Sequence, residues 1–141
     1  MHHLMFAAAP AAFARSSTGA YRQIGIETGV GSADPHRLVG MLFDGCLEAI
    51  AQARGALREG DMAAKGRAIG RAVRIVEEGL KAALDLDAGG ALAADLNALY
   101  AYIGLRLTQA NLRNDDALLD ECQHLVEPLR DGWAGIAAQA A

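Results

Sequence analysis

The chain has 141 residues, which suits one domain, and its 13 Lys and Arg against 17 Asp and Glu give a net charge of −4. This balance argues against a dedicated nucleic-acid binder, which normally carries a basic face. Hydrophobic residues make up 52% of the chain but aromatics only 5%, and the 31 alanines favour an all-α fold. No apolar run approaches the roughly 20 residues of a membrane span, so we expect no membrane insertion.

The first part of the chain shows no helical period and is interrupted by glycine and serine. It carries no Lys or Arg before Arg15, so the positive region of a secretory signal is missing and we expect a cytoplasmic protein. We therefore predict a flexible N-terminal arm over residues 1–31, followed by a helical domain over residues 32–141. Three apolar side chains of the arm have no evident core to join: Tyr21, Ile24 and Ile26.

Two amphipathic helices are predicted after the arm. Asp34 as N-cap and Pro35 at the first helical position begin a helix that ends at Gly60. Asp61 then caps a second helix, whose apolar positions continue to Leu84. The expected core positions of this second helix are Met62, Ile69, Val73, Val76, Leu80 and Leu84.

Two further helices complete the chain. The turn over residues 85–90 precedes a third helix, and the break around Asn114 and Asp115 precedes a fourth, which contains Pro128. Short connections between long helices make sequential neighbours antiparallel. The sequence therefore predicts an all-α, antiparallel up-down four-helix bundle.

The second and third helices have more apolar surface than one core requires. A second stripe of small residues is predicted on each, at about 100° per residue. On the second helix it comprises Ala64, Ala68, Ile75 and Ala82, and on the third Ala94, Ala98, Ala101, Leu105 and Leu112. Three interpretations stay open: a groove in which a partner helix docks, alanine used only for its helix propensity, and self-association.

The titratable residues do not form a pattern typical of catalysis. His36 and His124 have no carboxylate or thiol at a spacing used in metal or nucleophile sites, and Cys46 and Cys122 fit buried, reduced positions. We therefore predict no enzymatic activity, no metal and no cofactor.

Several segments together resemble the flagellar secretion chaperone family FliS. They are YRQIGIETGV at residues 21–30, SADPHRLVGMLFDG at 32–45, EGDMAAKG at 59–66, GLKAALDLDAGG at 79–90, LNALYAY at 96–102 and ANLRND at 110–115. The similarity extends over about residues 16–135, and Trp133 near the end also fits it.

The resemblance implies a cytoplasmic chaperone that binds the disordered C-terminal region of flagellin, prevents premature polymerisation and delivers the subunit to the flagellar export gate. It further implies a helical bundle whose client-binding surface is partly covered by the arm through its tyrosine, here Tyr21. The position three residues earlier, often apolar in the family, is Thr18.

The alanine-lined stripes fit such a role, because they offer apolar area without the stickiness of large side chains. We expect the arm to occupy the groove weakly and the client to displace it. The competing interpretation is a client-free structural or self-assembling bundle, including a homodimer of the free protein.

Overall fold

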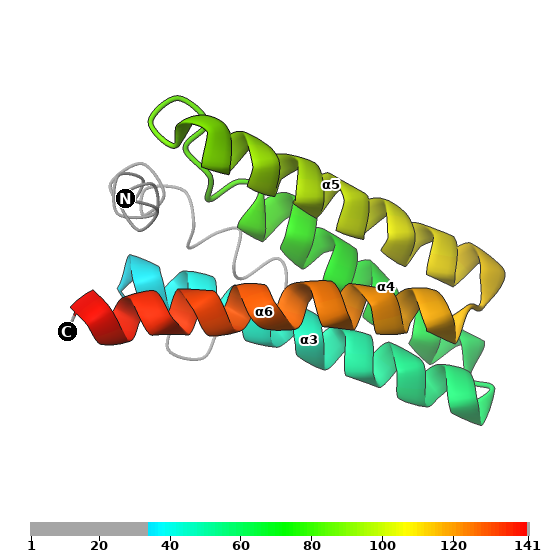
Figure 1. The fold of residues 1–141 in the computed structure, drawn as a ribbon. Helices are drawn as coiled ribbons and strands as arrows, with labels where there is room; N and C mark the ends of the chain where they lie inside the picture. Colours follow the sequence, from blue (N-terminus) through cyan, green and yellow to red (C-terminus); the bar gives the residue numbers. More distant parts are fainter. Residues whose placement is uncertain (1–33, 141) are drawn as a thin grey trace.

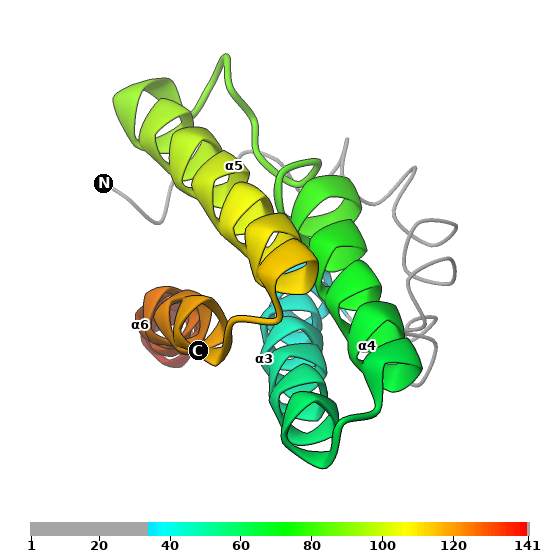
Figure 2. The same cartoon turned by 90° about the vertical axis from the view of Figure 1, so that its right-hand side faces the viewer.

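A computed structural model describes residues 34–140 of the chain, and their side chains as far as residue 136. Four long helical segments form the bundle (Figure 1): α3 (Pro35–Glu59), α4 (Met62–Arg74) continued by the π-helix η1 (Ile75–Leu80), α5 (Gly90–Arg113) and α6 (Asp116–Ala140). No strand occurs in this part of the chain. Each helix packs against two neighbours, and α4 and α6 flank α3 with α5 above them in Figure 2. The predicted all-α four-helix bundle is confirmed.

The start and end of the first helix lie where the turn residues predict them. The Asp34 carboxylate accepts a hydrogen bond of 2.7 Å from the backbone N–H of Arg37, and Pro35 occupies the first turn. Gly60 ends α3 with a φ of 76°, which a residue without Cβ adopts at little cost. Asp61 then caps α4 by accepting from the N–H of Ala64 at 3.1 Å.

The second helix differs from its prediction in one respect. It is not one regular helix to Leu84, because the α-helical pattern gives way to η1 after Arg74. The N–H of Lys81 donates to the carbonyl of Val76, five residues back, at 2.9 Å. A π turn inserts one residue into the helical repeat, and this shifts the side chains that follow it around the helix axis. Helical periodicity alone gives no signal for such an insertion.

The core lies between all the helices. Its largest fully buried side chains include Tyr100, Phe43, Leu42, Ile50 and Ile69. Buried alanines of α3, α4 and α5 bring the helix backbones close together, since few large rings are available to fill the space. Met62, expected in the core, is instead exposed.

A clasp joins the beginning of α3 to the last part of α6. The indole N–H of Trp133 donates to the carbonyl of His36 at 2.7 Å, and Nε2 of His36 donates to the carbonyl of Trp133 at 2.9 Å. The two rings are stacked, with centroids 4.3 Å apart and planes 6° from parallel. The chain's only tryptophan therefore fixes α6 beyond Pro128, where the helix lacks one backbone N–H.

A buried lysine joins α4 to α5. The ammonium group of Lys65 donates to the backbone carbonyl of Asn111 at 2.9 Å and to its side-chain oxygen at 2.7 Å. Asn111 lies in the last turn of α5, where backbone carbonyls have no partner within the helix. Lys65 thus serves as a C-cap for a neighbouring helix, and its positive charge interacts favourably with the negative end of the α5 dipole.

Buried titratable groups make the fold sensitive to alkali. Burial raises the pKa of the Cys46 thiol, and likewise that of Cys122, to about 12, and raises the pKa of Tyr100 as well. The unfolded chain ionises its thiols near pH 9, whereas the folded chain keeps them protonated. We therefore expect the free energy of unfolding to fall between pH 9 and about 12 as the two thiols ionise in the unfolded chain, with Tyr100 adding to the fall only from about pH 10. Each group contributes up to about 1.4 kcal/mol per pH unit.

Urea unfolding at a series of pH values measures this slope. Replacing Cys46 and Cys122 by alanine removes two of the three groups, so the variant should lose stability less steeply over the same range. An unchanged slope would contradict the assignment.

Candidate docking face on α5

Helix α5 is apolar on two opposite sides. Its inward side supplies buried core residues, among them Tyr100, Ile103 and Leu107. A solvent-exposed set recurs every three or four residues on the opposite side, and we call it the docking face: Ala91, Ala94, Ala98, Ala101, Leu105, Thr108 and Leu112. A helix that serves only its own core needs one apolar stripe, so this second one lacks a structural explanation within the bundle.

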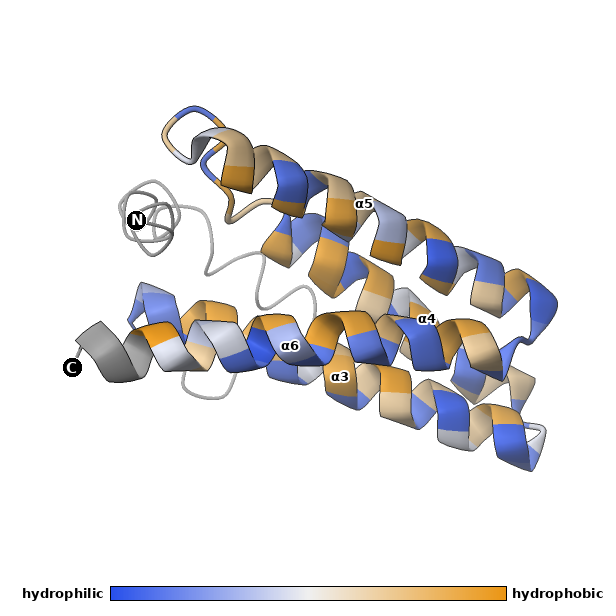
Figure 3. Cartoon of the chain, viewed as in Figure 1, coloured by the Kyte–Doolittle hydropathy of each residue, from blue (hydrophilic) through white to orange (hydrophobic). Residues whose placement is uncertain are grey.

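The docking face carries no charge. Leu105 is 54% exposed and Leu112 is 82% exposed, so two large aliphatic side chains stand in solvent on one side of one helix. In Figure 3, apolar colours recur along the edge of α5 that faces away from the other helices. The three charged residues of α5 are Asp95, Arg106 and Arg113, and all lie off this face.

One edge of the docking face is an ordered polar cluster with α6. Arg106 donates to Glu121 at 2.8 Å, and the hydroxyl of Tyr102 donates to the other oxygen of Glu121 at 2.6 Å. The Arg106 guanidinium lies 5.7 Å from the centre of the Tyr102 ring. Hydrogen bonds from Tyr102 and Arg106 lower the pKa of the Glu121 carboxyl, which therefore stays ionised.

Tyr102 is a candidate binding residue that the stripe pattern missed. Its ring is 41% exposed, is held in place by Glu121 and Arg106, and follows Ala101 of the docking face directly. A fixed aromatic ring loses little conformational entropy when a partner covers it, and Tyr is enriched at binding hot spots. The sequence does carry a signal for Tyr102, because it is an aromatic residue directly after Ala101 of the predicted stripe, on a helix with two apolar sides.

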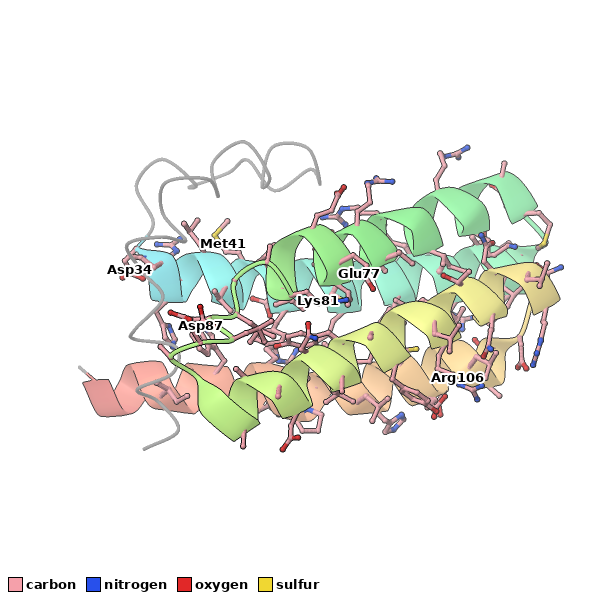
Figure 4. All side chains as sticks on the ribbon, turned by 90° about the horizontal axis from the view of Figure 1, so that it is seen from above. Asp34, Met41, Glu77, Lys81, Asp87 and Arg106 are labelled. Atoms are coloured by element: carbon pink, nitrogen blue, oxygen red, sulfur yellow. The ribbon has the colours of Figure 1, made fainter. Side chains whose placement is uncertain are left out.

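The other edge of the docking face borders α4 and η1. Glu77 of η1 lies against Gly104 of α5, and an ideal Cβ on that glycine would stand 2.7 Å from Oε1 of Glu77. Glu77 also pairs with Lys81, with 3.1 Å between Oε2 and Nζ. Figure 4 shows Glu77 and Lys81 between the two helices, and Arg106 at the opposite side of α5.

The stripe predicted on the second helix does not form a matching exposed surface. Ile75 is fully buried and Ala68 nearly so, and both belong to the hydrophobic core; the prediction of their exposure was wrong. The reason is that α4 packs against α3 on one side and α5 on another, so its two apolar stripes are both in use. Ala64 is half-buried and Ala82 is exposed just beyond the end of η1.

The predicted stripe on the third helix is placed as expected. Ala94, Ala98, Ala101, Leu105 and Leu112 are all exposed and share one side of α5. The arm residues Tyr21, Ile24 and Ile26 lie outside the described residues.

The residues offer little for chemistry. Among positions 34–140, no group of three or more His, Cys, Asp or Glu side chains could hold a metal ion. The raised pKa values of the two buried thiols make them poor nucleophiles. None of the described helices is long and apolar enough to cross a bilayer. What the surface of the described helices does offer is the exposed, uncharged docking face of α5.

Comparison with known proteins shows similarity to one family over most of the chain. The model of the family FliS, described as flagellar protein FliS, matches residues 17–140. The chain is 43% identical over 128 residues to the flagellar secretion chaperone FliS of Salmonella typhimurium, covering 91% of this chain and 95% of the relative. It is 44% identical over 124 residues to the flagellar secretion chaperone FliSB of Pseudomonas aeruginosa, covering 88% and 98%.

A more distant relative is the flagellar secretion chaperone FliS of Bacillus subtilis, 35% identical over 114 residues, which covers 81% of this chain and 80% of the relative. The match therefore includes all four helical segments of the bundle and nearly the full length of the first two relatives. The chain belongs to the FliS family of flagellar secretion chaperones.

Proposed function

We propose that this protein binds the disordered C-terminal region of flagellin in the cytoplasm, prevents its premature polymerisation and delivers it to the flagellar export gate. The observation that supports this most directly is the exposed, uncharged docking face of α5. A disordered amphipathic tail needs an apolar surface on which to fold, and the relatives are named as secretion chaperones.

The energetics of such a complex are favourable. Ordering a disordered segment on binding costs about 2–5 kcal/mol or more of the gross interaction energy. Each aliphatic side chain of the client that becomes fully buried contributes roughly 1.5–3 kcal/mol. A few such side chains along the face from Ala94 to Leu112 offset the cost of ordering. We expect the client-free protein to stay soluble, because most residues of the docking face are alanine and not large aliphatic side chains.

The direct test combines a binding assay with a polymerisation assay. The full chain is titrated with the C-terminal segment of flagellin in a calorimeter, and is then added to flagellin under polymerising conditions. We expect binding of one segment per chain and suppressed filament growth. If the pure protein instead forms a stable oligomer in light scattering and ignores the segment, the docking face serves self-association and the proposal is wrong.

The N-terminal arm adds a testable part to the mechanism. We propose that residues 1–31 occupy the binding surface weakly through Tyr21, Ile24 and Ile26, and that flagellin displaces them. Deleting residues 1–26 should then tighten binding of the flagellin segment, because the competitor is gone, and isothermal titration measures the change. An unchanged dissociation constant would rule out displacement while leaving flagellin binding itself intact.

A further inference from the structure

Glu77 is placed at the docking face by two features of the backbone. It lies within η1, and it is directed at the one position of α5 in this region that has no side chain, Gly104. A Cβ there would meet Oε1 of Glu77 at 2.7 Å, so any other residue would displace the carboxylate. Gly104 is buried, and its neighbours on the docking face are Ala101, Leu105 and Thr108.

The carboxylate is only partly neutralised. Lys81 contacts Oε2 at 3.1 Å, while Oε1 accepts no hydrogen bond from residues 34–136. The side chain of Glu77 is 39% exposed and that of Lys81 only 27%, so the acidic member of the pair is the more accessible. Glu77 is thus the acidic group at the α4 edge of an otherwise uncharged face.

A segment that docks beside Gly104 removes water from Oε1 of Glu77. Burying a carboxylate oxygen without a hydrogen-bond donor is costly, and more so than for a neutral group. We propose, on the basis of the proposed chaperone function, that the bound segment carries a lysine or arginine that donates to Glu77 and so fixes its position along α5. An acidic side chain at that place would be repelled. Glu77 is therefore a specificity residue of the docking face.

A charge-neutral variant tests this assignment. Glu77→Gln keeps the shape of the side chain and removes its charge, and we expect it to weaken binding of the C-terminal flagellin segment about 10-fold, since charge-assisted hydrogen bonds are the strong ones. Glu78→Gln is the matched control, because Glu78 is the next residue of η1 and is also exposed. It should change the affinity less than about 2-fold.

The partner residue is found by changing each lysine and arginine of the flagellin segment to glutamine in turn. One of these segments should bind about 10-fold more weakly to the wild-type chaperone and show no further loss with Glu77→Gln. Glu77→Lys in the chaperone, combined with a glutamate at the identified position of the flagellin segment, should restore the affinity. Additive losses for every client position would overturn the proposal.

Gly104→Ala tests the geometry through an independent route. The added methyl group displaces the Glu77 carboxylate, so we expect weaker binding in the wild-type background and a smaller effect when Glu77 is already alanine. Melting curves of each variant separate binding from folding. If the wild-type chain binds the segment and Glu77→Gln binds it equally well, the assignment of Glu77 as a specificity residue is wrong while the chaperone function stands. If the wild type binds no segment, both proposals fail.

Discussion

Replacing Leu105 by lysine should reduce binding of the C-terminal flagellin segment by more than about 100-fold while leaving the bundle folded. Leu105 is 54% exposed in the free chain, so its core contacts are few and a lysine there reaches water. In the complex the same position loses the burial of a leucine, about 1.5–3 kcal/mol, and must also accommodate a charge. Isothermal titration measures the loss, and circular dichroism follows the helices.

Leu86 provides the matched control for this variant. It has the same exposure, 54%, but lies in the turn before α5 and is not one of the docking-face residues. Leu86→Lys should bind the segment as the wild type does. Equal losses in both variants would mean that apolar surface in general, and not this face, drives association. Ile75→Lys is unsuitable as a test because Ile75 is a core residue and the change would unfold the bundle.

A large stability effect of a side chain outside the apolar core is expected at Lys65. Lys65→Met keeps most of the aliphatic stem but leaves the carbonyl and the side-chain oxygen of Asn111 without their donor. Losing hydrogen bonds to a buried charged group costs about 1.5–3 kcal/mol. Urea unfolding should show a decrease of this size in the free energy of unfolding.

The chain has one other lysine, and it serves as the control. Lys81 forms a half-exposed ion pair with Glu77, and pairs of this kind contribute at most about 1 kcal/mol. Lys81→Met should therefore destabilise the protein by clearly less than Lys65→Met does. Similar losses would show that Lys65 acts only as a surface cation, contrary to its burial.

The architecture was predictable because its signals are local. Asp34 with Pro35, Gly60 with Asp61, and the break at Asn114 act through the few backbone groups beside them, and each stands where the structure begins or ends a helix. The apolar period then fixes which side of α5 is buried. It also leaves a second side unexplained, and the structure places that side in solvent.

The errors come from contacts between helices. A helical period cannot show that α4 lies between two neighbours, so it predicts an exposed stripe that includes Ala68 and Ile75, although both are core residues. Nor does it show the π turn η1, which contains Glu77, the residue that lies against Gly104. Lys65, buried against Asn111, is likewise invisible in a sequence where a lysine normally predicts a surface position.

The clasp between His36 and Trp133 has a consequence for folding kinetics. Its two residues are 97 positions apart, whereas α3 with α4 and α5 with α6 are joined by short turns. Closing a long loop costs more entropy than closing a hairpin, so we expect the helical hairpins to form early and the clasp to form late. Contacts that are absent from the transition state slow unfolding without speeding folding. We therefore expect the stacked pair of His36 and Trp133 to slow unfolding and so to lengthen the lifetime of the folded bundle.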